Sequence, residues 1–386
     1  MANNNMLIKI SKEAAVKGTK KLSVVNGAKF IALKPMEVKG QQMLKISASN
    51  VSMQVETYIA CQCEKPETMG TIFVSASFLN IIKAIISDNL IIELNEKNLT
   101  LKSADSKTDI ELPFLENCNL LVADILEMED VQEHPTQKDF LYQSSINGLV
   151  LTNALKVFGC MTDTAKNQTF ASFICLELDE QCLGITSTNG NAFCHGAIPH
   201  LSLTKGTADV CRTTIPVEVE KALEACEIQE NVNVTMTVQD QLLFINWGSN
   251  ILYFRLSNIA FPEIPVEKMF GLPAECKCCV DKAELENAIR LVDLATPEKE
   301  KSNGVTSIEL FFTGDGLQLQ SSSSNVKIQA TDIEGEGGKT CLSGKYLSQL
   351  MGILPPRVVV EKKNEAGKGA VLLNGFAYIM PISKAK

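Results

Sequence analysis

The sequence predicts an α+β protein built from three tandem domains of similar design, with helices on one face of mostly antiparallel sheets. A short segment of alternating apolar and polar residues recurs at residues 43–55, 183–193 and 317–329, each time around a polar turn that contains Asn. Alternation on both sides of such a turn is typical of a β-hairpin. Roughly 135 residues separate consecutive copies, which is the size of a domain and not of a solenoid repeat.

Helical patterns flank each hairpin in the same order. Each unit opens with a helical candidate, at residues 12–22, 145–161 and 282–294. Asp281 is placed to cap the third of these, in which Leu285, Ile289 and Val292 recur at helical spacing. A shorter helix follows each hairpin behind a Ser or Thr, at residues 75–83, 214–223 and 343–350. Pro216 suits the first turn of the second of these shorter helices.

Each unit closes with a further pair of strands, at residues 90–101, 232–247 and 358–382. The order helix, strands, helix, strands predicts domains whose helices segregate to one face of an antiparallel sheet. Polar or Pro- and Gly-containing linkers fit near residues 128–138 and 266–274. The predicted domains therefore span residues 1–130, 131–270 and 271–386.

Composition limits the classes of partner. The chain has 386 residues, a formal net charge of −9 and a pI of about 5.1, so bulk charge should not bind it to nucleic acid or anionic membranes. No apolar run approaches the roughly 20 residues that a membrane-spanning helix needs. The segment at residues 1–5 is polar and has no signal-peptide pattern. These features predict a cytoplasmic protein with no membrane partner.

The 13 Cys residues are scattered mostly through apolar segments, where in a reducing compartment they act as small buried hydrophobes. Cys276, Cys278 and Cys279 form the one cluster that suggests a metal. Strand alternation places Cys276 and Cys278 on one face, and no second Cys or His pair follows at finger-like spacing. Strand packing is therefore the favoured interpretation, with a thiol or metal protein as the alternative. No metal or other cofactor is expected.

Catalytic patterns are also missing from the sequence. The Gly-rich segment at residues 335–339 lacks the spacing of a phosphate-binding loop and the Ser or Thr that would open a helix. No Ser-His-Asp or Cys-His grouping is indicated, and no acidic pair has the spacing of a metal site. The sequence therefore predicts that the protein is not an enzyme.

Four short segments, in this order and spacing, resemble those of a known family. After an alternating strand, Thr188-Asn189-Gly190-Asn191 is similar to a Thr-Asp-Gly-His turn. The other three segments are Phe173-Ile174-Cys175-Leu176-Glu177, Phe261-Pro262-Glu263 and Tyr378-Ile379-Met380-Pro381-Ile382. Together with the three-domain order, they make the chain resemble the bacterial DNA polymerase III beta subunit, the DNA sliding clamp, over essentially its whole length.

The resemblance implies a ring-forming homodimer. Two chains would close head to tail, with helices lining the pore and strands forming the outer surface. Such a ring would hold duplex DNA topologically and independently of sequence, and it would raise the effective concentration of a tethered polymerase. An acidic protein can do this if the inner helices are locally basic, because phosphate contacts are local. The implied partners are duplex DNA, DNA polymerase, the clamp loader, other clamp-binding-motif proteins and a second copy of the chain.

The resemblance also implies a hydrophobic cleft for partner peptides. Its walls, carried over by position, are Ala171, Thr188, Gly190, Asn191, Ala192, Phe193, Pro262, Val266, Tyr378, Met380, Pro381 and Ile382. Met and aromatic side chains suit a groove that accepts several related peptides. Without the resemblance, Phe193, Tyr378 and Met380 would be interpreted as ordinary core residues.

The chain departs from the family at several of these positions. Asn191 and Ala192 stand where the family often has His-Arg, and Val266 replaces a basic residue. The final residues are Ser383-Lys384-Ala385-Lys386, where Arg-Leu is common. Peptide preference is therefore expected to differ from the usual motif.

The DNA-facing residues implied by the resemblance are basic side chains on or near the helices. They are Lys12, Lys17, Lys20, Lys21, Lys83, Lys156, Lys166, Lys282, Arg290 and Lys345. Any one of them can equally be an ordinary solvated surface residue. The segment with Glu218, Glu220 and Glu224 is acidic, and only Lys221 opposes it, so the first-domain lysines should dominate DNA contact.

A second function stays open from the sequence. The divergent cleft residues and the acidic helix would also suit a clamp-like scaffold or decoy, which binds partner proteins without acting as a DNA-loaded processivity factor.

Overall fold

The structure is a computed structural model that describes residues 6–63, 70–103, 109–122, 140–163, 165, 169–206, 211–239, 241–302, 304–335, 337–364 and 369–382. The chain forms two compact units. The first comprises Met1–Thr152, Pro199–Cys211 and Glu218–Ser257, and the second comprises Asn153–Ile198, Arg212–Val217 and Asn258–Lys386. Segments of the predicted middle domain contribute to both units, and the three domain boundaries stay a prediction.

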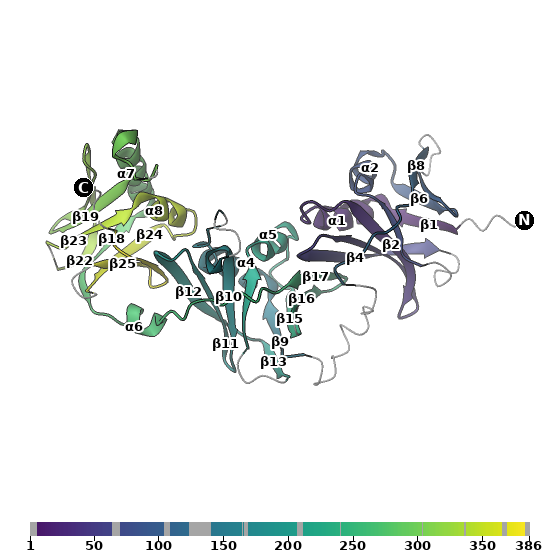
Figure 1. The fold of residues 1–386 in the computed structure, drawn as a ribbon, viewed down its shortest axis with the longest axis horizontal. Coiled ribbons are helices and arrows are strands. Elements are labelled where there is room, and N and C mark those ends of the chain that lie inside the picture. The colour runs from purple at the N-terminus through teal and green to yellow at the C-terminus, as the bar shows by residue number, and fades with distance from the viewer. Residues whose placement is uncertain are drawn as a thin grey trace, which may run out of the picture. The chain divides into compact units, whose positions relative to one another are not determined.

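The first unit is built on a 13-stranded sheet whose main path runs β13-β9-β15-β16-β17-β4-β1-β6-β7-β8, with β2, β3 and β5 attached at its side. Its strands are β1 (Met6–Ser11), β2 (Phe30–Val38), β3 (Gln41–Ser49), β4 (Met53–Cys63), β5 (Ile72–Ser75), β6 (Asn89–Leu94), β7 (Asn98–Ser103), β8 (Asp109–Pro113), β9 (Tyr142–Asn147), β13 (Ser202–Lys205), β15 (Asn233–Gln239), β16 (Leu242–Trp247) and β17 (Asn250–Arg255). Its helices are α1 (Lys12–Leu22), α2 (Phe78–Ala84) and α5 (Glu218–Ala225). Figure 1 shows α1 and α2 on one side of the strands.

Helix α1 packs on β4 and beside α2. Its buried face is formed by Ala15, Gly18, Thr19 and Leu22. A Cβ atom at Gly18 would lie 2.8 Å from Ile59 Cδ1, a distance that real Cβ contacts essentially never show. Glycine at this position therefore permits the close approach of α1 to the sheet.

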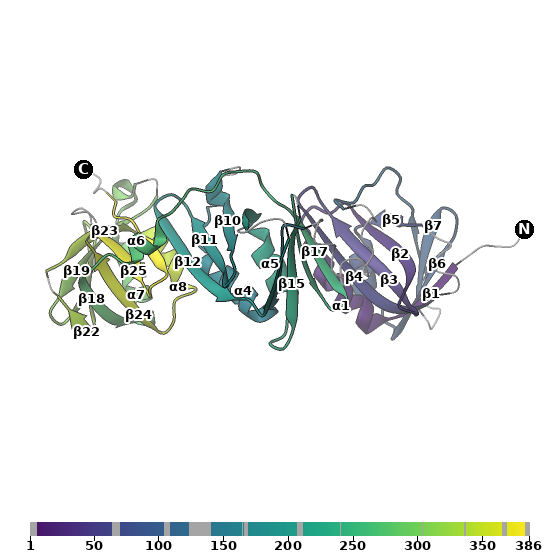
Figure 2. The same ribbon diagram turned by 90° about the horizontal axis from the view of Figure 1, so that it is seen from below.

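Strand β17, from the predicted middle domain, pairs antiparallel with β4, from the predicted first domain, with Leu252 opposite Val55. Figure 2 shows these two strands side by side. The backbone ladder is therefore continuous across β4 and β17, although their hairpins lie about 190 residues apart in the sequence. The hydroxyl of Thr57 also donates a hydrogen bond to Asn250 Oδ1 across this pair of strands.

The second unit contains two sheets. A nine-stranded sheet has the order β14-β10-β11-β12-β26-β25-β24-β18-β22, and a four-stranded sheet has the order β21-β20-β19-β23. The strands are β10 (Phe173–Leu178), β11 (Cys182–Thr188), β12 (Ala192–Pro199), β14 (Cys211–Pro216), β18 (Ala274–Asp281), β19 (Ser307–Thr313), β20 (Gly316–Gln320), β21 (Asn325–Gln329), β22 (Thr331–Glu334), β23 (Lys339–Ser343), β24 (Arg357–Lys363), β25 (Ala370–Leu373) and β26 (Ala377–Ile379). Its helices are α6 (Val266–Phe270), α7 (Lys282–Ala295) and α8 (Gly344–Met351), and α4 (Gly148–Phe158) begins in the first unit and ends in the second.

The three repeated hairpins are confirmed as β3–β4, β11–β12 and β20–β21. In the first, Asn50 Oδ1 accepts hydrogen bonds from the amides of Ser52 and Met53 at 2.9 and 2.8 Å. In the second, Asn189 Oδ1 accepts from the amides of Asn191 and Ala192, both at 3.0 Å. The side chain of Asn thus stands in for a backbone acceptor in both turns. The predicted α+β class with mostly antiparallel sheets is confirmed.

Three helix predictions had wrong starting points. The helix predicted from Ser75 begins at Phe78 as α2, because Ser75 is the last residue of strand β5. The other two predictions began earlier within a strand. Residues 145–147 belong to strand β9, and α4 begins only at Gly148, where Asn147 Oδ1 accepts from Val150 N at 3.0 Å. Thr214 and Pro216 belong to strand β14, and α5 begins at Glu218, so Pro216 is not in a first helical turn. In both cases the apolar spacing extends from a strand into the following helix, and helical periodicity alone does not mark the boundary.

The segments predicted as linkers differ from each other. Residues 266–270 form helix α6, so the second linker is partly helical, while residues 128–138 lie outside the described residues. The last predicted strand is interrupted, because Asn374 and Gly375 have φ angles of 49° and 72° and separate β25 from β26. A left-handed pair of this kind makes a tight reversal.

Helix α7 has the predicted N-terminal cap. Asp281 accepts hydrogen bonds from the amides of Ala283 and Glu284 at 2.8 and 3.1 Å. We expect Asp281→Ala to lower the free energy of unfolding by about 1 kcal/mol, because two helical amides lose their acceptor. Urea unfolding measures this change. Glu284→Ala is the matched control, since it removes a carboxylate from the same turn without removing the cap, and an equal loss in both variants would contradict the assignment.

The cysteine cluster lies on β18, as strand packing predicted. Cys276 and Cys278 are 2% and 1% exposed and belong to the core of the second unit, together with residues of α7, α8 and the four-stranded sheet. Within the described residues, no group of His, Cys, Asp and Glu could hold a metal ion. None of the helices described is both long and apolar enough to cross a membrane.

Candidate functional site

The turn between β11 and β12 forms one border of the predicted cleft. Thr188 Oγ1 donates to the carbonyl of Ala192 at 2.8 Å and accepts from Gly190 N at 3.1 Å. Gly190 has a φ of 92°, a conformation that L side chains rarely adopt. Gly190 and Asn191 are exposed at the tip, whereas Thr188 and Ala192 are buried beneath it. The turn is therefore rigid and presents backbone groups outward.

A stacked group of aromatic rings lies next to this turn; we call Phe193, Tyr378 and Phe270 the aromatic cluster. The centroids of Phe193 and Tyr378 are 5.3 Å apart, and those of Phe193 and Phe270 are 5.6 Å apart with planes only 5° from parallel. Phe193 and Tyr378 are 3% and 0% exposed, so both are core residues. Residues 264, 266, 269 and 380 pack around the cluster and are themselves half-buried.

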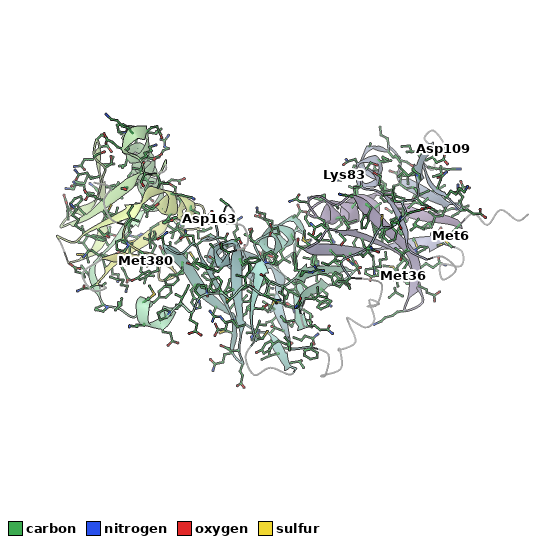
Figure 3. The ribbon with its side chains drawn as sticks, viewed as in Figure 1. Met6, Met36, Lys83, Asp109, Asp163 and Met380 are labelled. Atoms are coloured by element: carbon green, nitrogen blue, oxygen red, sulfur yellow. The ribbon has the colours of Figure 1, made fainter. Side chains whose placement is uncertain are left out.

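The final described segment crosses the same region. Phe193 in β12 lies opposite Tyr378 in β26. Beyond β26, Met380 N donates to the carbonyl of Asn191 at 2.9 Å, and Ile382 N donates to the carbonyl of Cys341 at 2.9 Å. Met380, Pro381 and Ile382 are half-buried. The segment is thus held by its backbone while its apolar side chains stay partly open to solvent (Figure 3, where Met380 is labelled).

Arg212 anchors the chain that leads into α6. Its Nη2 donates to the carbonyl of Pro262 at 2.9 Å, and its Nε lies 3.5 Å from Cys175 Sγ. The hydrogen bond to Cys175 raises the pKa of Arg212, and burial raises the pKa of the Cys175 thiol. Pro262 is half-buried, and Ala171 is 1% exposed in the short 3₁₀ helix η2 (Phe170–Ser172).

The structure brings the predicted cleft residues into one unit but divides them by accessibility. The residues open to solvent at least in part are Gly190, Asn191, Pro262, Val266, Met380, Pro381 and Ile382. The buried ones are Ala171, Thr188, Ala192, Phe193 and Tyr378. Phe270 and Met269 were missed by the sequence analysis, because α6 was interpreted as a linker. Their signal was the apolar pair immediately before Gly271.

The predicted DNA-facing lysines of α1 do not all project freely. Lys20 Nζ lies 2.6 Å from Glu227 Oε1, and Lys21 Nζ donates to Asn250 Oδ1 at 2.6 Å. Burial lowers the pKa of Lys21. Lys12 Nζ donates to the carbonyl of Ile85. Of the four lysines on this helix, Lys17 is exposed and makes no hydrogen bond or ion pair with the residues that the structure describes, so its ammonium is the most accessible to a phosphate.

The other predicted basic residues that the structure describes lie on four further helices, where Lys282 and Arg290 share α7 and the rest lie singly. Lys83 on α2 (Figure 3), Lys156 on α4, Arg290 on α7 and Lys345 on α8 are exposed, and Lys282 is half-buried. Lys166 lies outside the described residues. Helix α5 carries Glu218, Glu220 and Glu224 and the single Lys221. Among these helices, α1 is the most basic.

A search of the solved structures found similar chains over nearly the full length. The DNA polymerase III beta chain of Streptococcus pneumoniae TIGR4 has a TM-score of 0.80 at 13% identity, with 98% of this chain and 100% of that chain covered. The DNA polymerase sliding clamp of Bacillus subtilis has a TM-score of 0.79 at 15% identity, with 99% and 100% covered. The Helicobacter pylori beta clamp bound to a DNA ligase peptide has a TM-score of 0.75 at 17% identity, with 98% and 100% covered.

The chain has the sliding-clamp fold. No protein-family model matches the sequence, and no curated protein sequence does. At such low identities the structural similarity establishes the architecture, and the resemblance noted from the sequence is confirmed at that level. The clamp fold therefore rests on the spatial arrangement of strands and helices, while most side chains differ.

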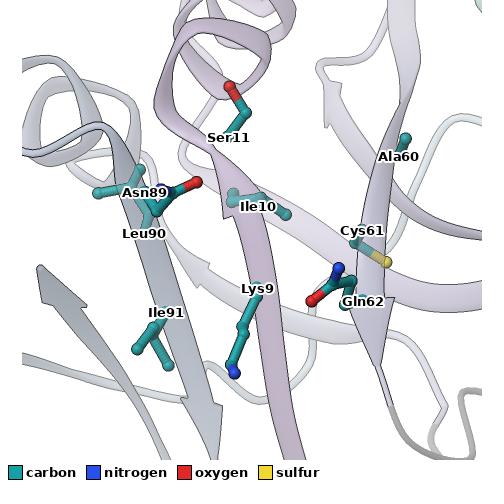
Figure 4. A pocket seen from close by; sticks show the side chains of 9 residues that line it. All are labelled: Lys9, Ile10, Ser11, Ala60, Cys61, Gln62, Asn89, Leu90 and Ile91. Atoms are coloured by element: carbon teal, nitrogen blue, oxygen red, sulfur yellow. The ribbon is translucent and has the colours of Figure 1, made fainter. Parts of the chain in front are cut away.

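A cavity of about 710 Å³ lies in the first unit of this clamp fold. Figure 4 shows its lining from three neighbouring strands, with Lys9 on β1, Cys61 on β4 and Asn89 on β6. Burial raises the pKa of the Cys61 thiol to about 11. Because the thiolate is the reactive form, this cysteine is chemically quiet at neutral pH, which disfavours a thiol-based activity at this site.

His195 gives the clamp fold a pH-dependent element beside the aromatic cluster. Its Nδ1 lies 2.8 Å from Thr186 Oγ1, its ring is 6.3 Å from that of Phe270, and burial lowers its pKa. His195 therefore binds a proton more readily in the unfolded chain, where its pKa has the ordinary value of about 6.5, than in the folded chain. We expect stability to be full above about pH 6.5 and to decrease as the pH falls through that value. Urea unfolding at pH 5–8 should show a smaller decrease for His195→Gln; equal profiles would contradict this role.

Proposed function

We propose that the protein is a DNA sliding clamp, which encircles duplex DNA as a head-to-tail ring of two chains and tethers polymerases. The observation that carries this proposal is the similarity of nearly the whole chain to sliding clamps, with both chains covered almost completely. The proposal includes a cytoplasmic location, no enzymatic activity, and loading by a clamp loader. The three domains would span residues 1–130, 131–270 and 271–386.

The partner cleft is the second part of the proposal. The Helicobacter pylori clamp binds a DNA ligase peptide. We place the corresponding site of this chain at the aromatic cluster and the half-buried residues Val266, Met380 and Ile382. The aromatic cluster, with the adaptable side chains of Met269 and Met380 beside it, suits short motifs from polymerases and other clamp-binding proteins.

Ring closure requires free strand edges in the first and third domains. Strands β8 and β21 each end their sheet, and within the described residues no other strand pairs with their outer sides. Strand β8 carries Asp109 and Glu111, whereas β21 carries Lys327. Two other edge strands are less suitable partners for β8. The edge of β23 is already occupied, because the carbonyl of Cys341 accepts a hydrogen bond from Ile382 N, and β22 is acidic like β8 itself. Charge complementarity therefore favours pairing of β8 in one chain with β21 in the other.

The lining of the pore is the third part. Lysines of α1, with Lys83, Lys156, Lys345 and Arg290, would supply phosphate contacts that are independent of sequence. Because Glu227 and Asn250 already engage Lys20 and Lys21, we expect few contacts between α1 and the phosphates. A topological ring needs little affinity for DNA, because dissociation requires opening and not merely the loss of contacts.

We expect Glu227→Gln to strengthen DNA binding. Lys20 loses its carboxylate partner and can contact a phosphate, so the dependence of log K on log salt should steepen by about 0.9, the value for one released counterion. Fluorescence anisotropy with a labelled duplex between 50 and 200 mM salt measures the slope. Glu230→Gln is the control, since it makes the same charge change at another exposed position of the same loop. If the slope changes equally in both variants, the change in net charge is responsible and the release of Lys20 is not.

Two measurements test the function as a whole. Light scattering should give the mass of a dimer, and the dimer should stay on circular DNA but leave after linearisation. Replacing Asp109 and Glu111 together by Lys should produce a monomer that leaves both DNA forms equally fast. A wild-type monomer that leaves circles and linear DNA at equal rates would contradict the proposal and favour a clamp-like scaffold or decoy.

A further inference from the structure

Helix α6 is attached to the second unit through side chains. Its backbone hydrogen bonds are internal to the segment: Val266 N to Ile264, Met269 N to Pro265 and Gly271 N to Glu267, at 2.8–3.0 Å. The nearest bonds to the rest of the unit lie at its two ends, where Arg212 Nη2 donates to the Pro262 carbonyl and Asn364 N donates to the Pro273 carbonyl. None of the five residues of α6 is fully buried. The helix can therefore leave the surface without breaking a backbone bond to a strand.

Val266, Met269 and Phe270 of α6 all pack against the core group that contains Phe193 and Tyr378, and the ring of Phe270 is the one that stacks on it. It stacks on Phe193 at 5.6 Å with an angle of 5°, and it lies 6.5 Å from Tyr378 with an angle of 25°. Phe193 and Tyr378 are buried, whereas Phe270 is only half-buried. Phe270 is thus the outermost ring of the stack, and its own side chain covers the apolar face that Phe193 and Tyr378 would otherwise present to solvent.

We infer that Phe270 is an internal plug of the partner cleft, which the aromatic side chain of a partner peptide displaces. The inference rests on the proposed peptide-binding function. The floor formed by Phe193 and Tyr378 already holds one flat apolar ring at stacking distance, so a second ring of the same kind is the ligand that it fits best. Met269 and Met380 lie beside the floor and can adjust to the residues that flank an incoming ring.

The plug sets both affinity and selectivity. A peptide that needs the floor binds only the fraction of molecules in which α6 has moved away, and its apparent dissociation constant rises in inverse proportion to that fraction. If the plug is seated in about nine molecules of ten, its removal strengthens binding about tenfold. A peptide without an aromatic residue gains nothing from the exchange, so the plug discriminates against it.

The test measures binding of the DNA ligase peptide found with the Helicobacter pylori clamp, and of copies in which each residue in turn is replaced by Ala. We expect Phe270→Ala to bind the unaltered peptide about tenfold more tightly than the wild type. The gain should disappear for every copy in which an aromatic side chain has been replaced by Ala, and an equal gain for peptides with and without an aromatic residue would overturn the plug. Lys268→Ala is the matched control on the same helix, where the side chain is exposed, and it should leave affinity unchanged.

A second readout follows the plug directly and does not depend on a truncated variant. With 4-fluorophenylalanine at position 270, addition of peptide should shift the fluorine resonance from a stacked to a solvent-exposed environment. Phe270→Leu provides a milder substitution, with a smaller gain in affinity.

The outcomes separate the plug from the function. Equal or weaker binding by Phe270→Ala, with the wild type binding normally and its fluorine signal unmoved, overturns the plug and leaves the cleft intact. Absence of binding by the wild type and both variants, together with equal departure from circular and linear DNA, overturns the proposed function and the plug with it.

Discussion

Replacing Met380 and Ile382 together by Ala should weaken the binding of a partner peptide by about 2–4 kcal/mol, the range of truncated hot-spot residues. Both side chains are half-buried, while Met380 N and Ile382 N are held by backbone hydrogen bonds to Asn191 and Cys341. The double substitution therefore removes apolar surface from the cleft and leaves the chain path unchanged. Isothermal titration calorimetry with the peptide measures the loss.

The matched control for this variant is the pair Leu291→Ala and Leu294→Ala on α7. Those side chains are 41% and 72% exposed, so the control also removes exposed apolar surface from the second unit, but at residues outside the aromatic cluster. It should not change peptide affinity. Light scattering should show dimers for both variants, because the proposed seam lies on β8 and β21. Unchanged affinity in the Met380/Ile382 variant would remove the cleft from this position.

Lys45→Met should lower the free energy of unfolding by about 3–5 kcal/mol, because it leaves a buried carboxylate without its ammonium partner. Lys45 Nζ lies 2.9 Å from Glu56 Oε1, and the two side chains are 6% and 2% exposed. Glu56 also accepts from Gln54 Nε2 at 2.7 Å and from Tyr253 OH at 3.0 Å. The Glu56 carboxylate thus connects side chains of β3, β4 and β17. Urea unfolding measures the free energy that is lost when Lys45 no longer neutralises it.

The companion variant Lys45→Met/Glu56→Leu separates charge from packing. Removing both members of a buried pair is often nearly neutral, so most of the lost stability should return. Lys20→Met is the surface control, since its pair with Glu227 is largely exposed and should contribute at most about 1 kcal/mol. A double variant as unstable as Lys45→Met alone would show that the loss comes from packing.

Local structure was predictable wherever neighbouring residues determine it. The Asn50 and Asn189 turns and the capped start of α7 all follow from interactions within a few residues. Helix α1 matches the predicted residues from end to end. Each of these features would form in much the same way whatever the rest of the chain did.

Boundaries and burial were less predictable, because they depend on distant partners. Residues 145–147 extend as β9 since β15 pairs with all three of them and β13 pairs with Ser145 on the other side, which overrides their helical spacing. Phe193 and Tyr378 lie on strands that pair only in the folded chain, and their stacking with Phe270 unites three segments. The apolar pair before Gly271 indicates that Phe270 is packed, but nothing local indicates that its partners are Phe193 and Tyr378.

Hairpins, helices, the repeat of a domain-sized pattern and the residue types available for a predicted cleft and a basic helix were predictable from the amino-acid sequence alone. Which of those residues are accessible became known from the folded structure, in which Glu227 and Asn250 engage Lys20 and Lys21 and Phe270 stacks on Phe193. This difference arises from how far apart in the chain the interacting residues lie. Turns, caps and alternation arise from contacts within a few residues, whereas accessibility depends on side chains that folding brings together from far apart in the chain.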